Sequence, residues 1–205
     1  MAIEFDLDGR HADMAYGILA GLVTPRPIAL ITTINESGVV NAAPFSFFNV
    51  VGSEPPMVVV APGNKESGIP KDTARNIRRS REFVVHMVDE AIAQQMVGCS
   101  AGLMPEESEI DHVGFTTQAS EVVSVPRIVE APVALECREH TTLEIGGNRL
   151  VVGTVHRVHV RDGVIDAETG RLLDNGSNYA PIGRMASPDW YTRTSDRIQI
   201  SKPSS

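Results

Sequence analysis

The chain has 205 residues, 42% of them hydrophobic, which suits one globular domain with its own core. Its 18 Lys and Arg residues against 26 Asp and Glu residues give a formal charge of -8, which argues against nucleic acid or an anionic membrane surface as the main partner. No apolar run approaches the roughly 20 residues that cross a bilayer, and the amino terminus is acidic where a signal peptide would be basic, so we expect a cytoplasmic protein.

The first 24 residues are expected to form an amino-terminal arm and a helix. Ile3 to Gly9 is predicted to be extended, and Asp13 to Leu22 to form a short helix. The helix leads into Thr24-Pro25, where proline favours extended backbone.

Residues 25–49 carry the most distinctive pattern of the chain. A strand is predicted over Ile28–Ile34, followed by a polar turn at residues 35–38 and a second extended run. This run is predicted to stop being a regular strand at Asn41, because the segment from Asn41 to Ser46 is small and contains a proline that lacks a backbone donor. Backbone groups left free there would form a ligand-binding edge.

Three phenylalanines follow this edge. In an extended chain Phe45 and Phe47 face one side and Phe48 the other, so we expect at least one of them in the core.

The next segment alternates strands with a loop and a helix. Strands are predicted over Phe45–Val51 and Met57–Ala61, the second being a continuous apolar run typical of a strand buried on both faces. Residues 62–70 form a loop long enough to wrap a ligand, and Asp72 is a suitable N-cap for a helix of about Thr73–Ser80.

A second strand and helix come next. The strand is predicted over Phe83–Val88, and Asp89 begins a helix in which Ile92, Met96 and Cys99 share one face. That face is expected to pack on the core.

The rest of the chain is mostly loop and hairpin. Residues 102–120 are acidic and irregular, with a short helix expected around 105–110 and no assigned function. Strands are predicted over Val133–His140 and Leu150–Val160, joined by a glycine-containing turn. Residues 179–205 form an irregular segment, and the aperiodic mixture of Pro, Gly, Arg and aromatic residues over Tyr179–Tyr191 indicates a segment shaped by a site or a partner.

The absence of several motifs argues against other chemistries. The chain has neither a G-x-G-x-x-G nor a P-loop motif. Cys99 and Cys137 have no nearby partner and are expected to be reduced, packed thiols. His156 and His159 lie three residues apart on a strand and face opposite sides, so no metal site is expected.

His86 and His140, in or at the end of apolar strands, are expected to be satisfied core or edge histidines rather than bases.

One family resemblance covers most of the chain. Its motifs, in order, are Arg26-Pro27-Ile28-Ala29, Thr32-Thr33, Asn41, Ala43 to Asn49, Pro55-Pro56, Lys71-Asp72-Thr73 and Asn76-Ile77, with further likeness near Cys137 and at Arg184. In this order and spacing they resemble the flavin reductase-like family of FMN-binding split β-barrels.

The resemblance implies a mainly β split barrel with peripheral helices, forming one domain over residues 1–205. It also implies an oxidoreductase with non-covalently bound FMN, NADH or NADPH as transient electron donor, and a homodimer with the flavins near the subunit interface. No catalytic side chain is expected, because the flavin carries the chemistry.

The candidate phosphate site is the start of the helix after residue 70. A helix amino terminus offers free N–H groups and a partial positive charge. Lys71 would add a counter-charge and Thr73 a hydroxyl, with Asn76 one turn further along, whereas a carboxylate at Asp72 would compete with an anion. The alternative is an ordinary capped helix with an exposed lysine.

The candidate ring site is the edge that begins at Asn41. The flavin ring needs an apolar face and polar groups along its pyrimidine edge. Taken with the resemblance, the candidate cofactor-binding residues are Thr32, Thr33, Asn41, Ala42, Ala43, Pro44, Phe45, Ser46, Asn49, Ser67, Lys71, Asp72, Thr73, Asn76 and Arg184. Two other classes stay open: a non-catalytic flavin carrier, and a flavin-free relative of the same fold.

Overall fold

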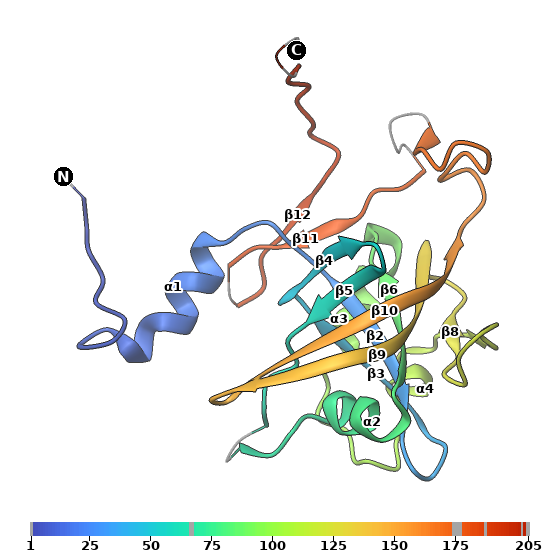
Figure 1. The fold of residues 1–205 in the computed structure, drawn as a ribbon, viewed down its shortest axis with the longest axis horizontal. Helices are drawn as coiled ribbons and strands as arrows, with labels where there is room; N and C mark the ends of the chain where they lie inside the picture. Colours follow the sequence, from blue (N-terminus) through green and yellow to red (C-terminus); the bar gives the residue numbers. More distant parts are fainter. Residues whose placement is uncertain (1, 66–67, 174–177, 187, 202, 204–205) are drawn as a thin grey trace.

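The computed structural model describes residues 2–65, 68–173, 178–186, 188–201 and 203. Its body is a seven-stranded antiparallel sheet in the order β3-β2-β6-β9-β10-β5-β4 (Figure 1). The strands are β2 (Ala29–Ile34), β3 (Val40–Phe45), β4 (Phe48–Ser53), β5 (Pro56–Val60), β6 (Glu82–Met87), β9 (Val133–Ile145) and β10 (Asn148–Val160). Side chains from six of these strands meet in one core, while β3 and β4 form the two sheet edges, so the sheet curls into a barrel that is split between them.

Short elements surround the barrel. They are η1 (Ala12–Met14), α1 (Ala15–Leu22), β1 (Arg26–Pro27), α2 (Asp72–Ser80), η3 (Glu90–Ile92), α3 (Ala93–Gly98), α4 (Glu109–Val113), β7 (Thr117–Gln118), β8 (Arg127–Ile128), β11 (Ile182–Arg184) and β12 (Tyr191–Arg193). Figure 1 shows α1 standing away from the barrel on the left and α2 covering its lower end. No helix in the described ranges is long and apolar enough to span a membrane.

Strand β2 separates two hydrophobic cores. Ala29 and Ile31 point into the barrel, where Ile77 of α2 also packs. Leu30 points the other way and packs with Met96 of α3 and the neighbouring helix α4. Successive side chains of a strand alternate between faces, so the apolar run of β2 serves a core on each side.

The prediction that the second strand stops at Asn41 is wrong. β3 continues to Phe45 and pairs residue by residue with β2, from Val40 opposite Ile34 to Phe45 opposite Ala29. Pro44 is tolerated because β3 is an edge strand, where a missing donor on the outer side breaks no ladder hydrogen bond.

At least one of the three phenylalanines lies in the core, as expected, but the predicted alternation of their faces is wrong. Phe45 is buried in the barrel core and Phe48 packs against the same core, whereas Phe47 is 45% exposed. The strand breaks between β3 and β4, so the alternation does not carry across residues 46 and 47.

Most other elements are confirmed with shifted ends. Helix α2 begins at Asp72, so the N-cap position belongs to Lys71 rather than to Asp72. The helix expected around residues 105–110 begins later, at Glu109. Ile92, Met96 and Cys99 do lie together in the core, and the two cysteines are free and buried.

His86 is a satisfied core histidine, as the sequence predicts. The side chain is fully buried; its Nδ1 lies 2.9 Å from the Leu30 carbonyl oxygen, and its Nε2 accepts a hydrogen bond from the Ile128 N–H at 2.9 Å. Because Nε2 accepts, the ring is neutral with its proton on Nδ1.

Position 153 of β10 requires glycine, because the Phe83 ring packs directly against its backbone. A Cβ at position 153 would lie 2.4 Å from Cζ of Phe83, whose ring is fully buried and has no room to move. We expect Gly153→Ala to lower the free energy of unfolding by at least about 1 kcal/mol in urea denaturation. Adding Phe83→Leu should recover part of the loss, and equal stability of Gly153→Ala and wild type would contradict the clash.

Candidate functional site

A cleft of about 230 Å³ opens beside the edge strand β3. One wall is β3 itself, through Asn41, Ala43, Pro44 and Phe45. The first turn of α2 forms a second wall, and the third combines residues 99–103 with Glu109. The cleft therefore joins a strand edge, a helix amino terminus and a loop far away in the sequence.

The amino terminus of α2 is open. No side chain among the described residues caps it, and Lys71 at the N-cap position has extended backbone, with φ -60° and ψ 154°. The N–H groups of a first helical turn have no partner within the helix, and Asp72 and Thr73 of this turn line the cleft. The Lys71 Nζ lies over the Phe45 ring, 5.6 Å from its centroid, and adds positive charge at the same end.

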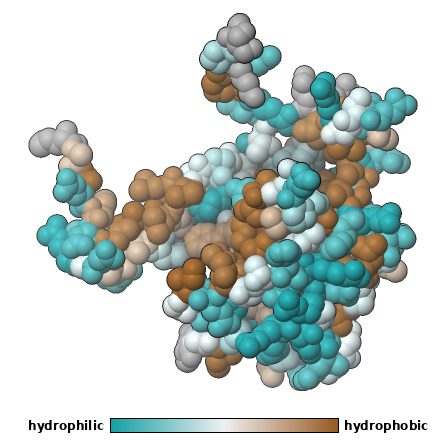
Figure 2. Space-filling view, viewed as in Figure 1, coloured by the Kyte–Doolittle hydropathy of each residue, from teal (hydrophilic) through white to brown (hydrophobic). Residues whose placement is uncertain are grey.

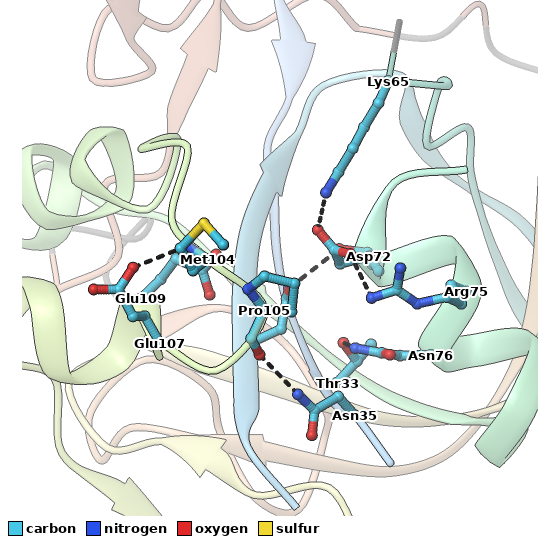
Figure 3. Close-up of polar contacts among 12 residues, drawn as sticks. Thr33, Asn35, Lys65, Asp72, Arg75, Asn76, Met104, Pro105, Glu107 and Glu109 are labelled. Carbon is cyan, nitrogen blue, oxygen red and sulfur yellow. Dashed lines mark hydrogen bonds and ion pairs between the residues drawn. The ribbon is translucent and has the colours of Figure 1, made fainter. Parts of the chain in front are cut away.

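Asp72 does not compete for these donors. Its carboxylate forms ion pairs with Lys65 from the preceding loop and with Arg75 one turn along α2, the second at 2.6 Å (Figure 3). The carboxylate thereby holds two cations near the start of the helix. Lys65, which the sequence analysis did not single out, also lines the cleft.

Two polar pairs tie α2 to the sheet. The amide of Asn76 donates to the Thr33 hydroxyl at 3.0 Å, and both side chains are buried. The amide of Asn41 donates to the Thr73 hydroxyl at 3.3 Å, at the wall of the cleft. Thr33 and Asn76 therefore fix the helix against the strand and lie behind the cleft, while Asn41 and Thr73 reach it.

The outer edge of β3 is covered by the segment around α4. The Ala42 N–H donates to Oε2 of Glu109 at 2.9 Å, and the Ser108 hydroxyl donates to the Val40 carbonyl. Burial raises the pKa of the Glu109 carboxyl, while the bond from Ala42 opposes the rise. The segment left without a function in the sequence analysis thus forms a wall of the site, opposite Lys65 and Asp72 in Figure 3.

Cys99 contributes surface to the cleft rather than a nucleophile. Burial raises the pKa of its thiol to about 12, so the group stays protonated near neutral pH.

Besides Thr33, Ala42 and Asn76, four further candidate residues in the described ranges do not line the cleft. The Thr32 hydroxyl donates to the Pro126 carbonyl, and the Ser46 hydroxyl accepts from Arg26. Asn49 lies on the exposed strand β4, where its Oδ1 accepts from the Val50 N–H. Arg184 donates to the Pro188 carbonyl and stacks over Tyr191. Ser67 lies outside the described residues.

No group of three or more His, Cys, Asp or Glu side chains in the described ranges is arranged to hold a metal ion. His159 instead pairs with the buried Glu136. The residues that line the cleft offer anion binding at the start of α2 and hydrogen bonding along β3.

Comparison with known proteins places the chain in a family. The model of the flavin reductase like domain matches residues 21–183. An uncharacterised protein of Halalkalibacterium halodurans is 43% identical over 195 residues, which cover 89% of this chain and 93% of that protein.

Two solved structures are similar over almost the whole chain. Nitrilotriacetate monooxygenase component B from Bacillus cereus is 32% identical with a TM-score of 0.91, covering 98% of this chain and 99% of that one. Pseudomonas fluorescens 2-nitrobenzoate 2-nitroreductase is 37% identical with a TM-score of 0.87, covering 98% and 96%. The fold is the split barrel that the sequence predicts, and the chain belongs to the flavin reductase-like family.

Proposed function

We propose that the protein is an oxidoreductase that binds FMN non-covalently at the β3–α2 cleft and takes electrons from NADH or NADPH. Membership of the flavin reductase-like family supports a flavin-related oxidoreductase function, and the relatives with solved structures include a monooxygenase component and a nitroreductase. The observation that carries the choice of FMN is the open amino terminus of α2, which offers a site for one terminal phosphate.

The residues at the cleft fit the parts of FMN. The first-turn N–H groups of α2, the Lys71 ammonium and the Thr73 hydroxyl would hold the phosphate. Asp72 would keep Lys65 beside it. The Asn41 side chain would orient the polar edge of the ring along β3. When bound, FMN would supply the redox chemistry by accepting hydride from a reduced nicotinamide.

Binding of FMN is tested against riboflavin, which lacks the phosphate. We expect FMN to bind at least about tenfold more tightly in fluorescence quenching titrations of the purified protein, because riboflavin has no phosphate to contact the start of α2. Equal affinities for FMN and riboflavin would contradict a phosphate site at the start of α2. Protein that takes up no flavin at all would favour the flavin-free class.

Electron transfer is tested by anaerobic reduction of the FMN-loaded protein. Loss of the yellow absorption on adding NADH or NADPH is the expected result, and the faster of the two identifies the donor. Bound FMN that neither nicotinamide bleaches would identify a flavin carrier instead.

We further propose that FMN stays bound as a prosthetic group between turnovers. Its ring and its phosphate would be held by two separate segments of the chain, β3 and the start of α2. Extensively dialysed protein should then oxidise nicotinamide with a suitable acceptor and no added flavin. A rate that requires free flavin and saturates with it would show that flavin is a substrate.

The proposed homodimer has a candidate surface on α1 and β4. Leu22 is 76% exposed and Leu19 51%, and on β4 Val50 and Val51 are 68% and 52% exposed. Figure 2 shows hydrophobic side chains over α1 and across the neighbouring part of the barrel face. Exposed apolar patches of this kind mark protein interfaces more often than free surface.

Replacing Leu22 with glutamate should break this interface. We expect sedimentation at micromolar concentration to give twice the chain mass of 22.1 kDa for the wild type and the monomer mass for Leu22→Glu. Leu172→Glu is the matched control, since Leu172 is 51% exposed on a loop remote in sequence from α1 and β4. A monomeric wild type that holds FMN would refute the dimer.

A further inference from the structure

A second cleft, of about 420 Å³, lies between α2 and the β9–β10 hairpin. It uses another face of the helix, because Ala74, Arg78 and Arg81 follow at intervals of four and three residues and so line up on one side. Pro70, Ala74 and Val151 give it an apolar floor. Figure 2 shows hydrophilic side chains over the lower part of the molecule, where Figure 1 places α2.

Four arginines line this cleft: Arg75, Arg78, Arg81 and Arg149. Arg75 donates to Asp72, and Arg149 donates to Glu144 and Asn64, so these two have partners.

The other two arginines are each in an ion pair with a carboxylate but make no side-chain hydrogen bond in the described ranges. Among the described residues, neither the Arg78 nor the Arg81 side chain donates a hydrogen bond; Nη1 of Arg78 lies 3.9 Å from Glu144 and Nη1 of Arg81 3.2 Å from Oε2 of Glu139. That buried Oε2 accepts no hydrogen bond within the part of the chain that the structure describes. A guanidinium carries five N–H donors in a planar fork, so two such groups at one cleft leave many donors for a ligand.

The backbone is irregular on both sides of the cleft. Arg81, at the C-cap of α2, has φ +63°, the left-handed region that glycine or asparagine usually occupies at this position. Across from it β9 carries a bulge, because Thr141 pairs with Val152 and Glu139 with Gly153, which leaves His140 unmatched. Strained residues and bulges concentrate at functional sites, where they aim side chains.

The lining of this cleft is net positive, whereas the protein as a whole is net negative. The lining carries four guanidinium groups against the carboxylates of Glu139 and Glu144, in a chain of net charge -8. A planar guanidinium group can donate to two phosphate oxygens at once. An apolar floor accommodates a base or a ribose. We infer that this cleft binds a nucleotide through its phosphate groups, at a site separate from the phosphate site at the start of α2.

The inference is tested by calorimetric titration of the purified full-length chain at low salt, with and without added FMN. The probes are 5′-AMP, 2′,5′-ADP and inorganic phosphate. We expect at least one nucleotide to bind about tenfold or more tightly than inorganic phosphate, because only the nucleotides contact the apolar floor. The heat should shrink as salt rises, as charge pairing requires.

Arg81→Gly separates binding from folding. Glycine adopts the left-handed conformation without cost, which offsets the loss of the ion pair with Glu139, so the melting temperature is expected to stay close to that of the wild type. Nucleotide binding should nevertheless weaken by about tenfold or more in Arg81→Gly and in Arg78→Gln, because each removes charge-assisted hydrogen bonds. Arg171→Gln makes the same change of charge at an exposed residue outside the cleft and should leave binding within about twofold of wild type.

Absence of binding by both nucleotides, or unchanged affinity in both cleft variants, would overturn the inference. So would inorganic phosphate binding as tightly as the nucleotides. If NADPH displaces 2′,5′-ADP, the nucleotide is part of the nicotinamide donor; if it does not, the site takes a separate nucleotide. FMN titrations of the same variants should match wild type, so this inference and the proposed flavin site fail or stand independently.

Discussion

Replacing Lys71 with alanine is expected to weaken FMN binding by about 1.5–3 kcal/mol, roughly 10- to 150-fold in Kd. The ammonium lies at the open end of α2, where a phosphate would meet both its charge and the free N–H groups of the first turn. Fluorescence quenching titrations measure the loss, which should shrink as salt screens the charge of this exposed side chain.

Two further variants sharpen this test. Thr73→Val removes one neutral hydrogen bond and should cost nearer 1 kcal/mol of FMN binding, with little dependence on salt. Arg78→Gln removes a positive charge from the same helix but outside the flavin cleft, so FMN affinity should not change. Wild-type FMN affinity in Lys71→Ala would mean that the phosphate lies elsewhere.

Lowering the pH from 7.5 to 5 is expected to cost the fold about 2 kcal/mol through His86 alone. Burial lowers the pKa of this histidine from 6.5 to about 4, so the unfolded chain binds a proton in this range that the folded chain does not. Stability is therefore fully present above about pH 7 and is lost as the pH falls from there toward about 4. Urea denaturation at several pH values measures the slope.

His86→Gln isolates this contribution. The variant is expected to be less stable at every pH, but its stability should be nearly the same at pH 7.5 and pH 5. The lowered pKa of Glu82 also makes stability fall with pH, but only below its ordinary pKa of 4.5. The raised pKa of Glu109 makes stability change with pH in the opposite direction, so neither group mimics the histidine. An unchanged pH slope in His86→Gln would show that the ring is not the titrating group.

The sequence predicted the barrel strands well where apolar residues are continuous. Phe83 to Val88 and Met57 to Ala61 each lie within one residue of β6 and β5. It failed at Asn41 to Phe45, because small residues and a proline resemble a turn until the pairing partner is known. Tertiary context overrode local propensity there, since β2 offers β3 a complete ladder on one side.

The candidate cleft was only partly predictable. Lys71, Thr73 and Asn41 carry local signals, namely a helix start and a strand edge. Glu109 and residues 99–103 reach the cleft only through the packing of α3 and α4 on β3, which no short-range pattern encodes. Lys65 is recognisable only through its ion pair with Asp72, a contact between a loop and a helix.

The double-sided strand β2 has a consequence for folding cooperativity. Because Leu30 belongs to the core with the helices and Ile31 to the barrel interior, neither core can melt without disturbing the strand that the other shares. The amides of β2 should accordingly be among the slowest to exchange with deuterium, at the free energy of global unfolding. A cleft built against β3, whose whole length is paired to β2, is thereby held in place by the most persistent part of the molecule rather than by a locally mobile segment.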